Sequence, residues 1–304
     1  LGVVSLGVIL FLMFRQIKNK KKDNDIIKKQ RDAIEQRQTE IIDSINYAQR
    51  LQDAILPPPS RFIQAKIDNF VVYQPKDVVS GDFYWMHEKQ LPNGDEVIYI
   101  AVGDCTGHGV PGALVSVVCS NALEHSAKEL VALDTGSLLD GTNELVQNTF
   151  NTEKGSISDG MDISLIGYNK TTGKVQFSGA NNSLYIARTS NAQMINLMEV
   201  KGTRQPIGIF QYQKSFETNE LELEKGDILY MSSDGYVDQF GIGNKSGDDK
   251  GGKKFKKKSF KELLVQVAKM KFEDQQNHIL KTHINWKGDF EQTDDICLMG
   301  LRIN

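Results

Sequence analysis

The chain has 304 residues, enough for one large domain or two ordinary ones with a substantial core. Hydrophobic residues make up 39% and charged residues 25%, an ordinary globular composition that excludes a mostly disordered chain. The formal net charge of −3 argues neither for nor against nucleic acid, and we expect no nucleic-acid partner. The three cysteines, Cys105, Cys119 and Cys297, are odd in number and lack zinc-like spacing, which favours reduced thiols in a cytosolic environment.

Residues 1–14 contain no charged side chain. A helix of that length spans about 21 Å, short of the roughly 30 Å hydrocarbon core, so we interpret it as the end of a truncated transmembrane helix. Residues 15–31 then hold eight basic and two acidic residues. In a signal peptide the basic residues come first. The positive-inside rule therefore predicts that everything downstream lies in the cytoplasm. The alternative is a fragment of a buried core helix.

Residues 15–56 are interpreted as a basic juxtamembrane segment followed by a signalling helix. From residue 26 to 56 there is no Gly or Pro, and an apolar residue recurs every seventh position, at Ile27, Ile34, Ile41, Ala48 and Ile55. This spacing predicts a parallel coiled coil that makes a homodimer through residues 26–56. The companion positions three residues on are mostly polar, so a single amphipathic helix packed on the following domain is the alternative. Three prolines at 57–59 end the helix.

Residues 57–304 form the third predicted domain, in which short strand patterns alternate with a few helices. Strands are predicted at residues 70–73, 83–86, 97–102, 163–168, 175–178, 184–187, 194–198, 216–223, 228–231 and 296–303. Helices are predicted at residues 110–133, 138–150, 260–271 and 276–286. Consecutive strands favour an α+β fold, in which helices cover antiparallel sheets.

Residues 241–258 are rich in glycine, aspartate and lysine, and we expect a mobile, solvated loop. The alternative is a basic arm for an acidic partner or for lipid head groups.

The densest motif is the stretch from Val102 to Ala113. A β-branched and aromatic run at residues 97–102 ends just before Asp104, several glycines follow, and Pro111 opens an apolar segment. The predicted order is strand, acid, tight turn and helix.

Other carboxylates stand in similar settings at the edges of apolar strands. They are Asp82, Asp234, Asp294 and Asp295. Like charges gathered at strand ends repel one another unless they are protonated or bound to cations, and sets of oxygen ligands suit Mg²⁺ or Mn²⁺. Taken singly, each could be an aspartate in a turn. Together they predict a metal site.

The order of these motifs resembles the metal-dependent serine/threonine phosphatases of the protein phosphatase 2C (PPM) type, in the bacterial SpoIIE/RsbU-like branch. The motifs are Ser-Gly-Asp at 80–82, Gly-Asp-Cys-Thr-Gly-His-Gly at 103–109, Gly-Met-Asp-Ile-Ser at 160–164, Ser-Asp-Gly at 233–235 and Thr-Asp-Asp-Ile at 293–296. The resemblance covers about residues 57–304. It implies a four-layer αββα sandwich of two antiparallel sheets flanked by helices, with metals at one end.

The resemblance also implies roles for individual residues. Asp104 would bridge two Mn²⁺ or Mg²⁺ ions and the carbonyl of Cys105 would join one of them; Asp82 would hold the second, and Asp234 and Asp294 would complete the first. These carboxylates would be the catalytic residues, because a hydroxide activated by both metals would attack phosphorus directly.

Two further acids have less certain roles. Asp162 matches a position that in some relatives approaches a further metal or orients a water, and Asp295 is expected beside the ligands and not among them. His108 is expected to shape its turn or contact solvent. Lys76 is the only basic residue where animal relatives often carry a phosphate-binding arginine.

The predicted function is that of a membrane-bound sensor's cytoplasmic output domain, which hydrolyses phosphoserine on a regulatory protein such as an anti-sigma-factor antagonist. The alternatives are a membrane-tethered nucleotide cyclase and a scaffold that binds a phosphoprotein without cleaving it. A cysteine phosphatase is disfavoured, because no cysteine has a suitable arginine five residues on within a glycine-rich cradle.

Overall fold

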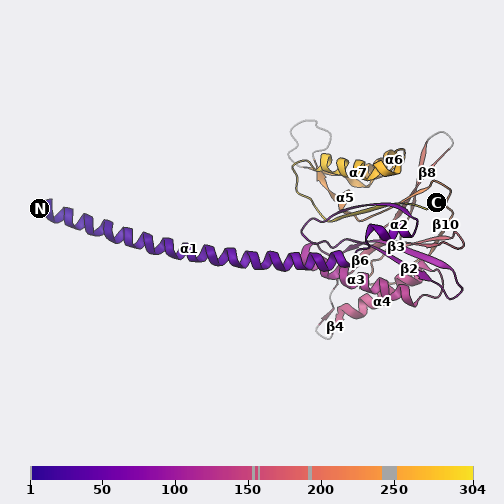
Figure 1. Cartoon of the computed structure of the whole chain (residues 1–304), viewed down its shortest axis with the longest axis horizontal. Coiled ribbons are helices and arrows are strands. Elements are labelled where there is room, and N and C mark those ends of the chain that lie inside the picture. The colour runs from indigo at the N-terminus through magenta and orange to yellow at the C-terminus, as the bar shows by residue number, and fades with distance from the viewer. Residues whose placement is uncertain (1, 153–154, 157, 191–193, 242–251, 304) are drawn as a thin grey trace. The chain divides into compact units, whose positions relative to one another are not determined.

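The computed structural model describes residues 2–152, 155–156, 158–190, 194–241 and 252–303 (Figure 1). The chain divides into two compact units, Leu1–Ala48 and Gln49–Asn304. Helix α1 (Gly2–Ile55) forms the first unit and continues into the second, where it ends just before Pro57. The prediction that the prolines end this helix is therefore confirmed. Among the described residues, no helix contains a stretch long and apolar enough to span a bilayer.

Within the first unit the heptad residues of α1 are exposed. Ile27, Ile34 and Ile41 have 60%, 65% and 59% of their surface accessible. The single chain thus leaves this apolar seam uncovered over its first three heptads.

The second unit contains two five-stranded antiparallel sheets. The first sheet has the strand order β1 (Asp68–Gln74), β14 (Ile296–Arg302), β11 (Ile228–Ser232), β8 (Leu184–Thr189) and β9 (Ile195–Val200). The second has the order β10 (Asn219–Leu221), β7 (Val175–Ala180), β6 (Met161–Asn169), β3 (Glu96–Cys105) and β2 (Phe83–Gln90). Two short hairpins pair β4 (Asn151–Thr152) with β5 (Gly155–Ser156) and β12 (Phe240–Gly241) with β13 (Lys253–Lys254).

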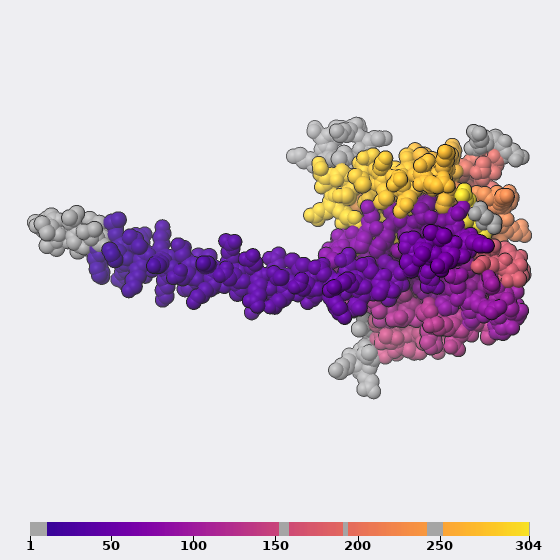
Figure 2. All heavy atoms as spheres, viewed as in Figure 1, coloured from indigo at the N-terminus to yellow at the C-terminus, as the bar shows by residue number. Residues whose placement is uncertain are grey.

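Helices cover the outer faces of both sheets. Helices α3 (Gly109–Glu129) and α4 (Thr135–Phe150) pack on the second sheet, and α6 (Lys256–Val267) and α7 (Phe272–Lys287) pack on the first. In Figure 2 the yellow α6 and α7 and the magenta α3 and α4 lie on opposite sides of this unit. Two short helices, α2 (Pro59–Gln64) and α5 (Gly235–Asp238), complete it. The predicted four-layer αββα arrangement is confirmed.

Strand β3 shows why the layers form. Its residues alternate between two cores, with Ile98, Ile100 and Val102 in the core between the sheets. Tyr99 and Ala101 face the core beneath α3 and α4. Successive side chains on a strand point to opposite faces. A strand covered on both faces therefore reads as the continuous apolar run seen in the sequence.

The expectation of a solvated loop at residues 241–258 is wrong for its described part. Lys253 and Lys254 form β13, and helix α6 begins at Lys256. Phe255 is 6% exposed and packs edge-on against Tyr236, with ring centroids 5.2 Å apart. One buried aromatic within the lysine run therefore anchors it to the core. Residues 242–251 lie outside the described residues.

Candidate active site

Three aspartates are brought side by side across the end of the second sheet. Strands β3 and β6 pair so that Asp104 lies opposite Asp162. Directly opposite residues of an antiparallel pair project from the same face of the sheet. On the other side of β3, Phe83 pairs with Gly103, so Asp82, one residue earlier, comes next to Asp104. The strand register therefore places like charges together.

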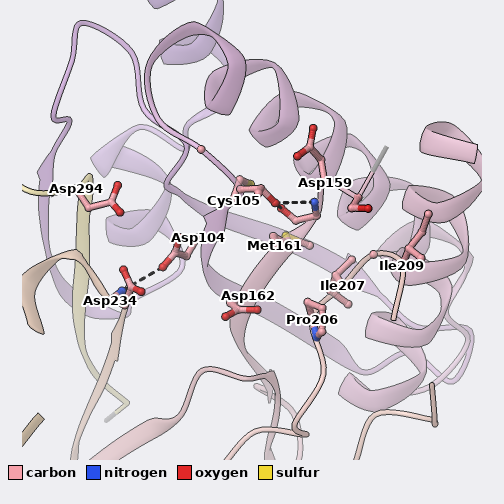
Figure 3. Close-up of a pocket in the computed structure, with 15 residues that line it drawn as sticks. Asp104, Cys105, Asp159, Met161, Asp162, Pro206, Ile207, Ile209, Asp234 and Asp294 are labelled. Carbon is pink, nitrogen blue, oxygen red and sulfur yellow. Dashed lines mark hydrogen bonds between the residues drawn. The ribbon is translucent and has the colours of Figure 1, made fainter. Parts of the chain in front are cut away.

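The first sheet contributes acids from the corresponding end. Asp234 lies two residues after the end of β11, and Asp294 and Asp295 directly precede β14. The backbone N–H of Asp234 donates to Oδ2 of Asp104 at 3.1 Å, which links the ends of the two sheets (Figure 3).

These side chains meet at a pocket of about 340 Å³. Of the predicted site residues, Asp104, Cys105, Asp162, Asp234 and Asp294 line it. The far wall is formed by two segments, 158–161 and 206–209 (Figure 3). Asp82 and Asp295 are not among the lining residues and are 3% and 2% exposed. No described residue that lines the pocket is basic.

The carboxyl groups hold on to their protons unusually strongly. Burial, and then the charge of Asp104, raise the pKa of Asp82 well above its ordinary value. Burial, and then the charge of Asp234, raise the pKa of Asp104 to about 8. Burial, and then the charge of Asp238, raise the pKa of Asp234 to about 6. The site thus gathers negative charge that the protein alone does not neutralise.

The residues present fit a divalent cation. Oδ2 of Asp82 is buried and has no hydrogen-bond partner, an arrangement that is costly unless something else binds the oxygen. Carboxylate oxygens are the ligands that Mg²⁺ and Mn²⁺ prefer. In the described part of the chain, no three acidic, histidine or cysteine side chains converge into a ready-made metal cluster. The carboxylates therefore surround the pocket, but they do not lie close enough together to form a complete metal-binding cluster.

Asp295 and Asp162 make specific contacts of their own. Asp295 accepts the backbone N–H of Lys76 and of Gly81, each at 2.7 Å, so its two oxygens fix the segment before Asp82. Asp162 accepts from Nδ2 of Asn181 at 2.8 Å. These contacts assign Asp295 to the backbone of residues 76–81, and its predicted place beside the metal ligands stays a prediction.

The glycine-rich turn after Asp104 is built by close backbone approach. A Cβ on Gly112 would lie 2.2 Å from the carbonyl oxygen of Gly107, and one on Gly81 would lie 2.3 Å from the same atom. Gly107 has φ +83°, a conformation that glycine adopts readily. Any larger residue at 81 or 112 would push apart the turns that carry Asp82 and Asp104.

His108 precedes helix α3 and takes part in a small polar network. Its Nδ1 lies 2.8 Å from Oδ2 of Asp77, and its Nε2 lies 3.1 Å from Nζ of Lys76. Since Lys76 can only donate, Nε2 accepts and Nδ1 carries the proton. The sequence singled out His108 and Lys76 but not their contact, because no spacing rule connects residues 31 and 32 positions apart.

The cysteines take no nucleophilic part. Cys105, Cys119 and Cys297 are free and buried. Burial raises the pKa of the Cys105 thiol well above its ordinary value, and a protonated thiol is a poor nucleophile.

The comparisons with known proteins agree with this geometry. The family model described as Stage II sporulation protein E (SpoIIE) matches residues 94–304. No curated protein matches significantly. The SiaA-PP2C domain of Pseudomonas aeruginosa is 29% identical with a TM-score of 0.73, covering 88% of this chain and 98% of that one.

Two further solved structures share the fold. The PP2C phosphatase domain of SpoIIE from Bacillus subtilis, with a fragment of its regulatory domain, is 18% identical with a TM-score of 0.57, covering 78% of this chain and 63% of that one. RsbX in complex with magnesium is 16% identical with a TM-score of 0.52, covering 78% and 96%. The matched family spans more than half of the sequence. The chain therefore belongs to the SpoIIE family of PP2C-type protein serine/threonine phosphatases.

Proposed function

We propose that this chain is the output domain of a membrane-bound bacterial sensor, and that it removes phosphate from phosphoserine on a regulatory protein with the help of two Mn²⁺ or Mg²⁺ ions. Asp104, the Cys105 carbonyl, Asp234 and Asp294 would hold one ion, and Asp104 and Asp82 the other.

One observation carries this proposal. Carboxylates from the ends of both sheets face a single pocket without a basic partner, and the pKa values of Asp82, Asp104 and Asp234 are all raised. Such a site repels a phosphate ester unless cations are bound in it. It therefore supports a phosphatase only as a metal-loaded site.

When bound, the metals would polarise the phosphoryl oxygens and supply a hydroxide near neutral pH. The chain's own residues would bind the metals and fix the positions of the ligands. Asp295 fixes the backbone before Asp82, and the Asp234 amide fixes one oxygen of Asp104, which leaves its other oxygen for a ligand. Asp162 would orient a water or approach a further cation.

Family membership and the position of the pocket support a protein substrate. The pocket lies at the edge of the sandwich, next to the exposed Ile209 and Phe210, where a protein surface can approach. We propose a phosphorylated regulator, such as an antagonist of an anti-sigma factor. The SpoIIE neighbour is described as a cell fate determinant with a regulatory domain, which supports a signalling role.

Phosphate release is the direct test. The full chain should release phosphate from a phosphoserine peptide when Mn²⁺ or Mg²⁺ is present. Loss of the metals should remove several kcal/mol of transition-state stabilisation, so EDTA should slow release at least about a hundredfold. Excess Mn²⁺ should restore the rate. Equal release with and without metal would contradict the proposal.

We further propose a membrane tether and a cytoplasmic location. The uncharged segment at residues 1–14 followed by basic residues supports both. Cell fractionation checks this, since full recovery of the chain in the supernatant after ultracentrifugation would contradict the tether.

A homodimer through residues 26–56 is supported by the exposed heptad isoleucines of α1. Changing Ile34 and Ile41 together to Glu should place repelling charges in the seam and weaken dimerisation at least about tenfold, as measured by sedimentation equilibrium. The matched control changes Thr39 and Asn46 to Glu, which adds the same charges seven residues apart on another face of the helix. A monomeric wild type, or equal effects of the two pairs, would contradict the coiled coil.

A further inference from the structure

Gln52, near the end of helix α1, is buried inside the second unit. Only 3% of its surface is exposed, although its neighbours Leu51 and Asp53 are exposed. Gln is a residue that mostly stays on the surface, and buried polar side chains are almost always hydrogen-bonded. The partners of Gln52 therefore decide what it does.

Both ends of the Gln52 carboxamide, the acceptor oxygen and the donor nitrogen, make hydrogen bonds. Its Oε1 accepts from the backbone N–H of Ser80 at 3.0 Å. Its Nε2 donates to the carbonyl oxygen of Ser80 at 2.5 Å and to Oγ of Ser116 at 3.1 Å. The side chain pairs with both backbone polar groups of Ser80, as a neighbouring strand would, and also binds helix α3 through Ser116.

Ser80 opens the short segment that ends at Asp82. The amide of Ser80 donates to Gln52, the amide of Gly81 donates to Asp295 at 2.7 Å, and the amide of Asp82 donates to Oγ of Ser80 at 3.0 Å. Three successive backbone amides are thus bound by side chains. The conformation of the backbone that carries Asp82 depends on those side chains, and one of them belongs to α1.

We propose that Gln52 is a positioning residue that holds residues 80–82 in the conformation in which Asp82 binds a metal ion. This rests on the proposed function, in which Asp82 is a ligand. Without the carboxamide, the buried N–H and C=O of Ser80 lose their partners, which is unfavourable, so the segment moves to regain hydrogen bonds. Asp82 moves with it. Residues that orient metal ligands typically change metal affinity about 10–100-fold when they are lost.

Calorimetric titration of the full chain with Mn²⁺ tests this. Gln52→Met keeps the length of the side chain but removes its hydrogen bonds, and should raise the Kd for Mn²⁺ at the site that Asp82 helps to form at least about tenfold. Gln52→Glu keeps the acceptor for the Ser80 N–H but puts a second acceptor opposite the Ser80 carbonyl oxygen, and should do the same. Ser116→Ala removes one of the three bonds and should have a smaller effect. Gln49→Met makes the same change one turn earlier at an exposed position and should leave Kd unchanged.

A purely structural role predicts something different. It would lower the Tm in EDTA without changing the Kd of the folded protein, whereas a positioning role raises Kd and lets saturating Mn²⁺ restore kcat. Unchanged Kd in both Gln52 variants, with metal binding intact in the wild type, would overturn the inference and leave the proposed function standing. A wild type that binds no Mn²⁺ would overturn both.

Discussion

Asp104→Asn should lower the phosphatase rate at least about a thousandfold and yet stabilise the metal-free protein. The rate falls because the carboxylate proposed to bind both metals is lost, and several kcal/mol of transition-state stabilisation go with it, each 1.36 kcal/mol being tenfold. The metal-free protein gains because a neutral amide replaces the buried carboxyl of Asp104, whose pKa is raised to about 8 by burial and by the charge of Asp234. A gain of about 1 kcal/mol would raise Tm by about 2–4 °C.

The variant should lose activity but gain stability in the absence of metal. This combination distinguishes a metal ligand from a residue that only supports the fold. Phosphate release and thermal unfolding in EDTA should be measured on the same preparation. Asp289→Asn, an exposed aspartate after helix α7, removes the same charge away from the pocket and should change neither quantity. Loss of activity together with a lower Tm would point instead to simple misfolding.

Metal-free stability should decrease as the pH rises from 6.5 to 8. The pKa of Asp104 is raised to about 8 by burial and by the charge of Asp234, and that of Asp82 is also raised, by burial and by Asp104. A carboxyl whose pKa is higher in the folded state stabilises that state below its unfolded pKa, and the stability is lost as the pH rises through the folded pKa. We expect a loss of about 1 kcal/mol or more, or about 2–4 °C in Tm.

The lower limit of that range avoids opposing groups. Burial lowers the pKa of His283 to about 4. The stability that neutral His283 contributes is therefore lost as the pH falls below 6.5, its pKa in the unfolded chain. Burial also lowers the pKa of His87. Above pH 6.5 the histidine contributions to stability change progressively less with pH, whereas the raised carboxyls still lose protons.

Saturating Mn²⁺ should abolish the decline, because metal binding displaces the protons and grows stronger with pH. Thermal unfolding at several pH values, with and without metal, measures both effects. A metal-free Tm that rises with pH over this interval would contradict the expectation, and Asp104→Asn should flatten the curve.

Periodicity predicted the strands that bury both faces. Strands β3, β11 and β14 are nearly continuous apolar runs whose residues are almost all buried. Strand β10 covers only residues 219–221 of the predicted 216–223, because Phe216 packs into the core beneath α3 and α4 and its N–H donates to Asp140. Tertiary contacts of that kind leave no trace in a local pattern.

The candidate site was predictable in its members but not in its arrangement. Each aspartate could be placed at a strand end from the sequence. The neighbours of Asp104 follow from the register, which sets Asp162 opposite it across β3 and β6. Register depends on which strands pair, and Gly103 and Ile163 carry no mark of their partnership.

Gln52 shows a different limit. Its heptad position, four residues after Ala48, looks like any other polar position beside a coiled-coil seam. Its burial results from the backbone groups of Ser80, which lie 28 positions away in sequence and offer a donor and an acceptor that no strand uses. Because two of its three hydrogen bonds are to backbone atoms, Gln52 cannot be recognised from residue types alone.

The contact between the Asp234 amide and the Asp104 carboxylate joins the two sheets at the site. The proposed ligands are divided in the same way, with Asp82 and Asp104 on one sheet and Asp234 and Asp294 beside the other. A cation bound by both groups would add a link between two layers that meet through an apolar core and a few hydrogen bonds, such as that from the Gly81 amide to Asp295. Metal occupancy would therefore strengthen the connection between the sheets, and a cell poor in manganese would hold a looser enzyme as well as a slower one.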